Sequence, residues 1–231
     1  MTTAIAESKV ETQFDLPETF ADIAERLGDI PLNRIIWLPR PATEDDVVRF
    51  CEARRPVELI DGFLVEKAMG FRESLLASLL IHHLTNFVLP RKLGLVSAPD
   101  AIMRLSPGLV RLPDVSFISW DRLLATGAHT KKVAPLAPNL AVEVLSEGNT
   151  RAEIDQKRRE LLAAGTQLVW VIDPKARTAE VYADATRPNE MSLLREADAF
   201  DGGTVLVGFR LPMAELFSDL DPPPTPKLTA N

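Results

Sequence analysis

Cysteine is nearly absent from this sequence, and basic residues are in deficit. The single cysteine, Cys51, excludes an internal disulfide and a zinc site built from cysteines, and it fits a reducing compartment. The 26 Lys and Arg residues against 33 Asp and Glu residues give a net charge of −7. This balance argues against a basic surface that coats nucleic acid, although it leaves room for a local basic groove.

Long hydrophobic segments and several common enzyme motifs are missing as well. The most apolar stretch, residues 75–89, is short for a membrane span and contains two histidines, so we expect a core helix and no membrane association. The first residues lack the pattern of a secretory signal, which leads us to expect a cytoplasmic protein. No nucleophile-elbow GxSxG, P-loop or dinucleotide fingerprint occurs, so acyl hydrolase, nucleotide phosphatase and dehydrogenase functions lack support.

The length of 231 residues is sufficient for one sizeable hydrophobic core. We expect a flexible N-terminus over residues 1–15, a single domain over residues 16–218 and a proline-rich disordered tail over residues 219–231. Local patterns predict helices near 44–54, 72–89 and 151–164 and a hairpin around 61–62. They predict strands within 94–118, around 143, and near 168–173 and 178–183. A loop is expected through the 120s and 130s. This mixed order indicates an α/β (α+β) fold in which helices flank a mixed sheet.

Glu143 interrupts an otherwise apolar run in the segment LAVEVLSEGNTRAEIDQKRREL, residues 140–161. The Val- and Leu-rich run is typical of a strand buried on both faces. An ionised carboxylate is unfavourable there unless a cation compensates it, so a positively charged group is expected nearby.

The helix that follows carries a candidate cation. Thr150 and Glu153 have the spacing of a capping box and therefore mark the start of this helix. Lys157 lies three residues after Ile154 and four before Leu161, which places it on their apolar face. A strand, a short turn and a helix folding back over the sheet could bring Lys157 to the buried carboxylate.

Asp114, in the segment LVRLPDVSFI, is predicted near the middle of another strand. Two carboxylates on neighbouring strands in a partly dry site raise each other's proton affinity unless a hard divalent cation such as Mg²⁺ lies between them. With Lys157 close enough to orient or polarise a water, the set would suit metal-assisted hydrolysis of a phosphodiester.

The ordered set of Pro113-Asp114, Glu143 in AVEVLS, Lys157 and the strand LVWVIDP resembles the PD-(D/E)XK restriction-endonuclease-like superfamily. More closely it resembles the large bacterial branch of endonucleases called the Uma family, and VELIDGFLVEKAMG fits too, so the resemblance covers roughly residues 35–217. It implies a restriction-endonuclease-like core with an N-terminal helical and hairpin extension. It also implies an endonuclease that hydrolyses DNA with Mg²⁺ or Mn²⁺, in which Asp114 and Glu143 hold the metal and Lys157 assists the attacking water.

The chain departs from the superfamily pattern at Leu145, where the lysine two residues after the glutamate is expected. In the Uma family the following helix supplies that lysine, which matches Lys157. Glu73, near the start of the long helix, would be the accessory acidic group that many relatives carry there, although this chain lacks the histidine that many also have nearby. Glu58 recurs in the hairpin motif of the family without an assigned role, and Leu161 stands where relatives often have tyrosine.

Structural alternatives exist for Asp114, Glu143 and Lys157. Glu143 and Lys157 could form a buried ion pair without a catalytic role, and Asp114 could start or cap a turn. Lys157 could instead pair with Glu153 on the helix surface. The resemblance also allows a catalytically inactive member that binds DNA or a protein, which the acidic net charge favours. Restriction-like nucleases often pair to cut both strands, so a homodimer is a further expectation.

Overall fold

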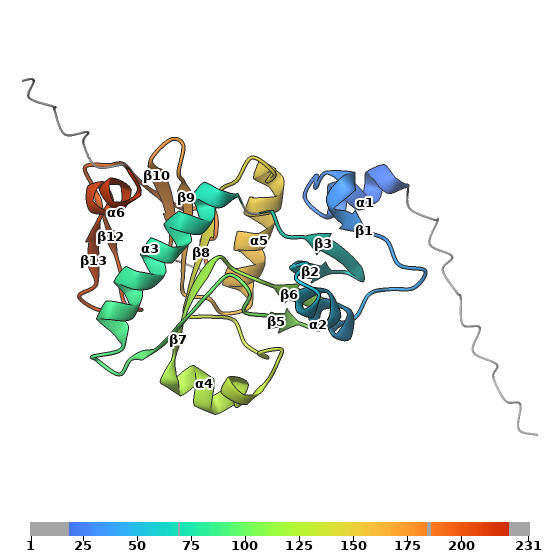
Figure 1. Cartoon of the computed structure of the whole chain (residues 1–231), viewed down its shortest axis with the longest axis horizontal. Coiled ribbons are helices and arrows are strands. Elements are labelled where there is room, and N and C mark those ends of the chain that lie inside the picture. The colour runs from blue at the N-terminus through green and yellow to red at the C-terminus, as the bar shows by residue number, and fades with distance from the viewer. Residues whose placement is uncertain (1–18, 69, 184–185, 222–231) are drawn as a thin grey trace, which may run out of the picture.

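Helices surround two larger β-sheets in the computed structural model, which describes residues 19–68, 70–183 and 186–221 (Figure 1). The described α-helices are α1 (Phe20–Arg26), α2 (Glu44–Glu52), α3 (Phe71–Val88), α4 (Trp120–Thr126), α5 (Arg151–Ala163) and α6 (Met213–Leu220), with short 3-10 turns at η1 (Leu32–Arg34) and η2 (Ala128–Thr130). None of these helices is long and apolar enough to cross a membrane. The segment 1–15, predicted to be flexible, and residues 222–231 of the tail predicted to be disordered over 219–231 lie outside the described residues, whereas Asp219 and Leu220 of that tail belong to α6.

Two larger sheets and one small hairpin organise the strands. The first sheet is antiparallel throughout and has the order β1 (Ile35–Ile36), β3 (Phe63–Glu66), β2 (Val57–Ile60), β6 (Leu109–Arg111), β5 (Met103–Ser106). The second has the order β11 (Ser192–Leu194), β10 (Thr178–Tyr182), β9 (Leu168–Asp173), β8 (Leu140–Val144), β7 (Val115–Ser119), β4 (Gly94–Ser97). It is mixed, because β8 and β9 are parallel and its other pairs are antiparallel. A separate pair joins β12 (Ala199–Asp201) to β13 (Arg210–Pro212).

The helices cover both faces of the six-stranded sheet. On one face, Leu80 and Leu84 of α3 and Phe217 of α6 pack with Val142 and Trp170 in the largest apolar cluster. On the other face, α5 packs its own apolar stripe against β8, β9 and β10. Figure 1 shows α5 standing between this sheet and the five-stranded sheet, which carries α1 and α2. The expected α/β (α+β) core, a mixed sheet flanked by helices with an N-terminal helical and hairpin extension, is confirmed.

Local sequence signals correctly located several boundaries. Asp61 and Gly62 have φ angles of 46° and 81°, the left-handed conformations that a tight two-residue hairpin requires. Thr150 accepts a hydrogen bond from the backbone of Glu153, whose own side chain completes the capping box at the start of α5. These contacts depend only on residues a few positions apart, which is why the sequence alone predicts them.

The predicted loop through the 120s is wrong, because α4 lies there. The hydroxyl of Ser119 accepts a hydrogen bond from the backbone N–H of Arg122 at 3.3 Å and so caps the helix. Gly127 ends it in the left-handed conformation, with a φ of 60°. Both signals are present in the sequence, but α4 is only seven residues long and has little apolar periodicity.

Candidate active site

Asp114 does not lie in the middle of a strand, contrary to the prediction. β6 ends at Arg111 in the five-stranded sheet and β7 begins at Val115 in the six-stranded sheet, so Asp114 lies where the chain passes from one sheet to the other. Pro113 offers no N–H to a sheet ladder, which accounts for the break. The Asp114 backbone N–H nevertheless donates to the Val142 carbonyl at 3.0 Å, which ties this link to β8.

The Asp114 carboxylate is held at both oxygens. Its Oδ2 accepts a hydrogen bond from the backbone N–H of Val144 at 2.7 Å. Its Oδ1 lies 2.8 Å from the ammonium of Lys67, which follows β3 in the other sheet. Asp114 therefore connects the two sheets through one backbone contact and one ion pair.

Glu143 meets Lys157, as the sequence pattern indicates. Along β8 the residues alternate between faces: Leu140 and Val142 belong to the cluster under α3, whereas Ala141 packs on the α5 side. Glu143 is on the α5 side by the same alternation. Its Oε2 accepts a hydrogen bond from the Lys157 ammonium at 2.8 Å.

Glu58 is the second partner of Lys157 and belongs to the same cluster. Its Oε1 lies 2.8 Å from the ammonium of Lys157 and also accepts the backbone N–H of Leu112 at 2.8 Å. Its Oε2 accepts from Arg111 at 2.8 Å, and Arg111 donates its Nε to Glu160 at 2.7 Å. Lys157 thus forms ion pairs with Glu143 and Glu58. The alternative pairing with Glu153 on the surface of α5 is not observed.

Burial and charge act in opposite directions on these groups. Burial is the largest influence on Glu143 and raises its pKa to about 8, with Lys157 opposing that rise and Asp114 adding to it. Burial would also raise the pKa of Glu58, but attraction to Lys157 and Arg111 outweighs it and lowers that pKa to about 2. For Lys157, attraction to Glu143 and Glu58 overcomes burial and holds its pKa above the usual range. Positive charge at this junction is therefore strongly favoured.

A small cavity of about 10 Å³ lies within the cluster, which is room for about one water or small ion. Its lining brings together all but one of the residues that the sequence singles out: Glu58, Asp114, Glu143 and Lys157. Their side chains are no more than 6% exposed. The site is consequently closed to a polymer in this conformation.

Arg34, in η1, also lines this cavity. Its guanidinium forms a bidentate pair with Glu153, at 2.7 and 2.8 Å, and donates to the carbonyls of Glu66 and Gly148. It thereby joins the end of β3, the loop after β8 and the first turn of α5. Each of these segments carries or adjoins one of the charged residues of the cavity, so Arg34 fixes their relative positions.

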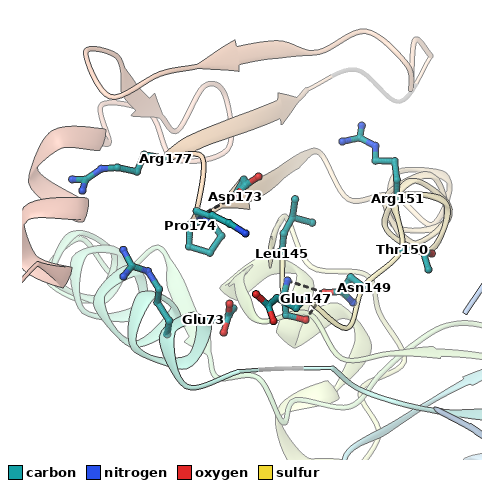
Figure 2. A pocket seen from close by; sticks show the side chains of 12 residues that line it. Glu73, Leu145, Glu147, Asn149, Thr150, Arg151, Asp173, Pro174 and Arg177 are labelled. Atoms are coloured by element: carbon teal, nitrogen blue, oxygen red, sulfur yellow. Dashed lines mark hydrogen bonds between the residues drawn. The ribbon is translucent and has the colours of Figure 1, made fainter. Parts of the chain in front are cut away.

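Glu73 lies outside this cluster. It occupies the first turn of α3 and lines a larger, open cavity of about 680 Å³, together with Glu147 on the loop between β8 and α5 (Figure 2). Asn149 lines both cavities, so the same loop separates them. The larger cavity is of a size that accommodates an organic ligand or a short stretch of polymer.

The sequence reasoning missed Lys67, Arg111 and Arg34. Arg111 had a usable signal, because it is a charged residue in the apolar run LVRLPD and is 1% exposed, like Glu143 in its own strand. Lys67 and Arg34 had none, since their partners Asp114 and Glu153 lie 47 and 119 residues away along the chain.

The carboxylate oxygens in the cavity suit a hard divalent cation as ligands. Oε1 of Glu143 and Oδ1 of Asp114 are buried and receive no directed hydrogen bond from any described residue. Carboxylate oxygens are the ligands that Mg²⁺ and Mn²⁺ prefer, and Mg²⁺ is commonly held by only one or two carboxylates and several waters. Over residues 19–68, 70–183 and 186–221 no group of three or more His, Cys, Asp or Glu side chains is placed to hold a metal. Two carboxylates are therefore the protein ligands available.

Comparisons with known proteins agree on a nuclease fold. A crystal structure described as a "putative nuclease belonging to DUF820" from Anabaena variabilis superposes with a TM-score of 0.67. The two sequences are 23% identical, and the match covers 78% of this chain and 99% of the other. No curated protein matches the chain. The model of the Uma2 family, described as "Putative restriction endonuclease", matches residues 45–214, which is most of the chain, and the protein belongs to that family.

Proposed function

We propose that the protein is a divalent-metal-dependent endonuclease that hydrolyses phosphodiester bonds of DNA. The observation that carries this proposal is the convergence of Asp114, Glu143 and Lys157, far apart in the sequence, on one buried cavity where the two sheets meet. The family and the fold support a nuclease, and the chemistry of the cavity supports the metal.

Each charged residue has a distinct part in the proposed reaction. Asp114 and Glu143 would hold Mg²⁺ or Mn²⁺ with their carboxylates, which line the same cavity. A divalent cation held there would supply positive charge to the phosphodiester and to the attacking water. Lys157 orients that water with its ammonium, and Glu58 is a positioning residue because it holds the ammonium at 2.8 Å.

The larger cavity is where we place the DNA strand. Arg72 and Lys175 line it, and neither forms an ion pair with a described residue, so both are available to phosphate groups. Glu73, next to Arg72 in α3, lines the same cavity and is the accessory acidic group of the proposal. Because the catalytic cavity is closed, the loop that carries Asn149 has to move before a phosphodiester reaches Asp114.

The test is cleavage of supercoiled DNA and of linear single-stranded DNA with Mg²⁺ or Mn²⁺. Asp114→Asn and Lys157→Met should each lower the rate by roughly 100-fold or more, since each removes a group that acts on the reacting atoms. Asp121→Asn, at an exposed carboxylate in the first turn of α4, is the matched control and should cut like the wild type. Wild-type cleavage by a folded Asp114→Asn variant would refute the assignment.

A second candidate function is a catalytically inactive member of the family that binds DNA or a protein. The observation that favours it is the mutual neutralisation of the cluster, in which Lys67 pairs with Asp114 and Lys157 with Glu143. Salt-sensitive DNA binding by a wild type that does not cut with either metal would support this function. Absence of DNA binding at low salt would direct the search to a protein partner.

The proposal includes a homodimer in the cytoplasm. A second copy would supply the second cut of a double strand, and the lone Cys51 suits a reducing compartment. Analytical ultracentrifugation of the full chain, with and without a DNA duplex, tests the assembly, and a monomer under both conditions would contradict it.

A further inference from the structure

Lys67 lines the cavity, has no part in the proposed mechanism, and is paired with one of the proposed metal ligands. Its ammonium lies 2.8 Å from Oδ1 of Asp114, and both side chains are almost fully buried. The other oxygen of that carboxylate, Oδ2, is already occupied by the N–H of Val144 at 2.7 Å. Oδ1 is thus the Asp114 oxygen that remains for a metal, and the Lys67 ammonium contacts it.

The ammonium is tethered in this position. It also donates a hydrogen bond at 3.0 Å to the carbonyl of Pro99, which lies between β4 and β5. Its contact with Asp114 is an ion pair at 2.8 Å between two buried side chains. Loss of that contact would leave the hydrogen bond to Pro99 as a second attachment of the ammonium.

We infer that Lys67 is a built-in competitor of the divalent cation: its ammonium neutralises Asp114 in the metal-free protein and must leave Oδ1 for the metal to bind. The inference rests on the proposed function, since it concerns the same metal site. A monovalent and a divalent cation cannot both contact one buried oxygen without strong repulsion, so the two are mutually exclusive at Oδ1. Metal affinity in the wild type is therefore reduced by whatever the contact between Lys67 and Asp114 contributes.

Removing the ammonium should tighten metal binding. Contacts between charged partners in proteins are typically worth about a tenfold to 100-fold change in an equilibrium constant, so Lys67→Met should bind Mn²⁺ at least tenfold more tightly than the wild type. The metal should also raise the thermal unfolding midpoint of this variant by more than it raises that of the wild type, because the variant has no Lys67 ammonium beside the Asp114 carboxylate.

The experiment is calorimetric titration of Mn²⁺ into the full chain, without DNA, for the wild type, Lys67→Met and Lys67→Gln. Lys67→Gln keeps a donor for the Pro99 carbonyl and is the variant measured should Lys67→Met fail to fold. Asp114→Asn removes the contested oxygen charge. Lys132→Met removes an exposed ammonium whose ion pair with Glu52 lies on the surface, and it controls for the overall loss of positive charge.

Tighter binding in the Lys67 variants, unchanged binding in Lys132→Met and loss of binding in Asp114→Asn would support the inference. Mn²⁺ binding that is measurable in the Lys67 variants and not in the wild type would support the inference most strongly. Equal affinity in the wild type and the Lys67 variants, with loss in Asp114→Asn, would overturn the competition while leaving the proposed metal site intact. Absence of binding in every protein would overturn both the competition and the metal dependence of the proposed function.

Discussion

Replacing Glu58 by glutamine should destabilise the fold in a way that depends on pH. Glu58 is 4% exposed, and its attraction to Lys157 and Arg111 lowers its pKa from the ordinary value of 4.5 to about 2. This difference corresponds to about 3 kcal/mol of stability at pH 7. Because the folded pKa is depressed, the contribution is fully present above about pH 4.5 and is lost as the pH falls through about 2. By pH 3 it should amount to about 1 kcal/mol.

The measurement is the free energy of unfolding from urea titrations at pH 7 and at pH 3, for the wild type and Glu58→Gln. The difference between the two proteins should shrink from about 3 to about 1 kcal/mol. Glu52→Gln is the matched control, because its ion pair with Lys132 is exposed and should contribute less than about 1 kcal/mol at either pH. Equal stability of Glu58→Gln and the wild type at pH 7, or a difference that does not change with pH, would refute the electrostatic reasoning.

Three further substitutions test the elements that surround the site. Asp46→Asn weakens the pair that the buried Asp46 forms with the half-exposed Arg40 at 2.7 Å and weakens the capping box of α2, so chemical denaturation at pH 7 should show a loss of about 1–2 kcal/mol. Gly28→Ala places a side chain at a φ of 89° and 2.8 Å from the backbone of Glu153, so the thermal midpoint should fall, and an unchanged midpoint would contradict the close packing. Leu161→Ala leaves a void under α5 and should cost about 2–5 kcal/mol in unfolding free energy, unless the helix settles to fill it.

Short-range sequence patterns predicted most helices and strands. Charged residues within apolar patterns predicted the central residues of the site. Glu143 and Lys157 were recognisable because each interrupts an apolar pattern whose period fixes the direction of its side chain. The same reasoning allowed a helix that folds back over the sheet to bring Lys157 to Glu143, and the two side chains are 2.8 Å apart. Their roles in catalysis stay a prediction until cleavage is measured.

The rest of the site depends on contacts that local patterns do not encode. Asp114 was assigned to a strand because apolar residues flank it, whereas Pro113 ends the ladder and the chain changes sheet there. Arg34 and Lys67 look like ordinary exposed cations in the sequence. They become buried only because the five-stranded sheet docks against α5 and β8, which is a property of the tertiary structure.

Arg34 also has a bearing on how the family resemblance is interpreted. The match to the family covers residues 45–214, so this residue and η1 lie before it. The chain therefore supplies a contact to its candidate site from a segment that the family comparison does not include. Arg34 holds Glu153, one helical turn before Lys157, and its effect on the cavity is one of alignment.

The charged cluster joins the two larger sheets to α5, the helix between them. Glu58 comes from one sheet, Glu143 from the other, and Lys157 from the helix between them, so the groups proposed to cut DNA also fasten the two halves together. Adding or removing a charge in this cluster should change the free energy with which the two sheets are held together. Loading the site with metal should accordingly be detectable far from it, as altered amide hydrogen exchange along the outer strands of both sheets.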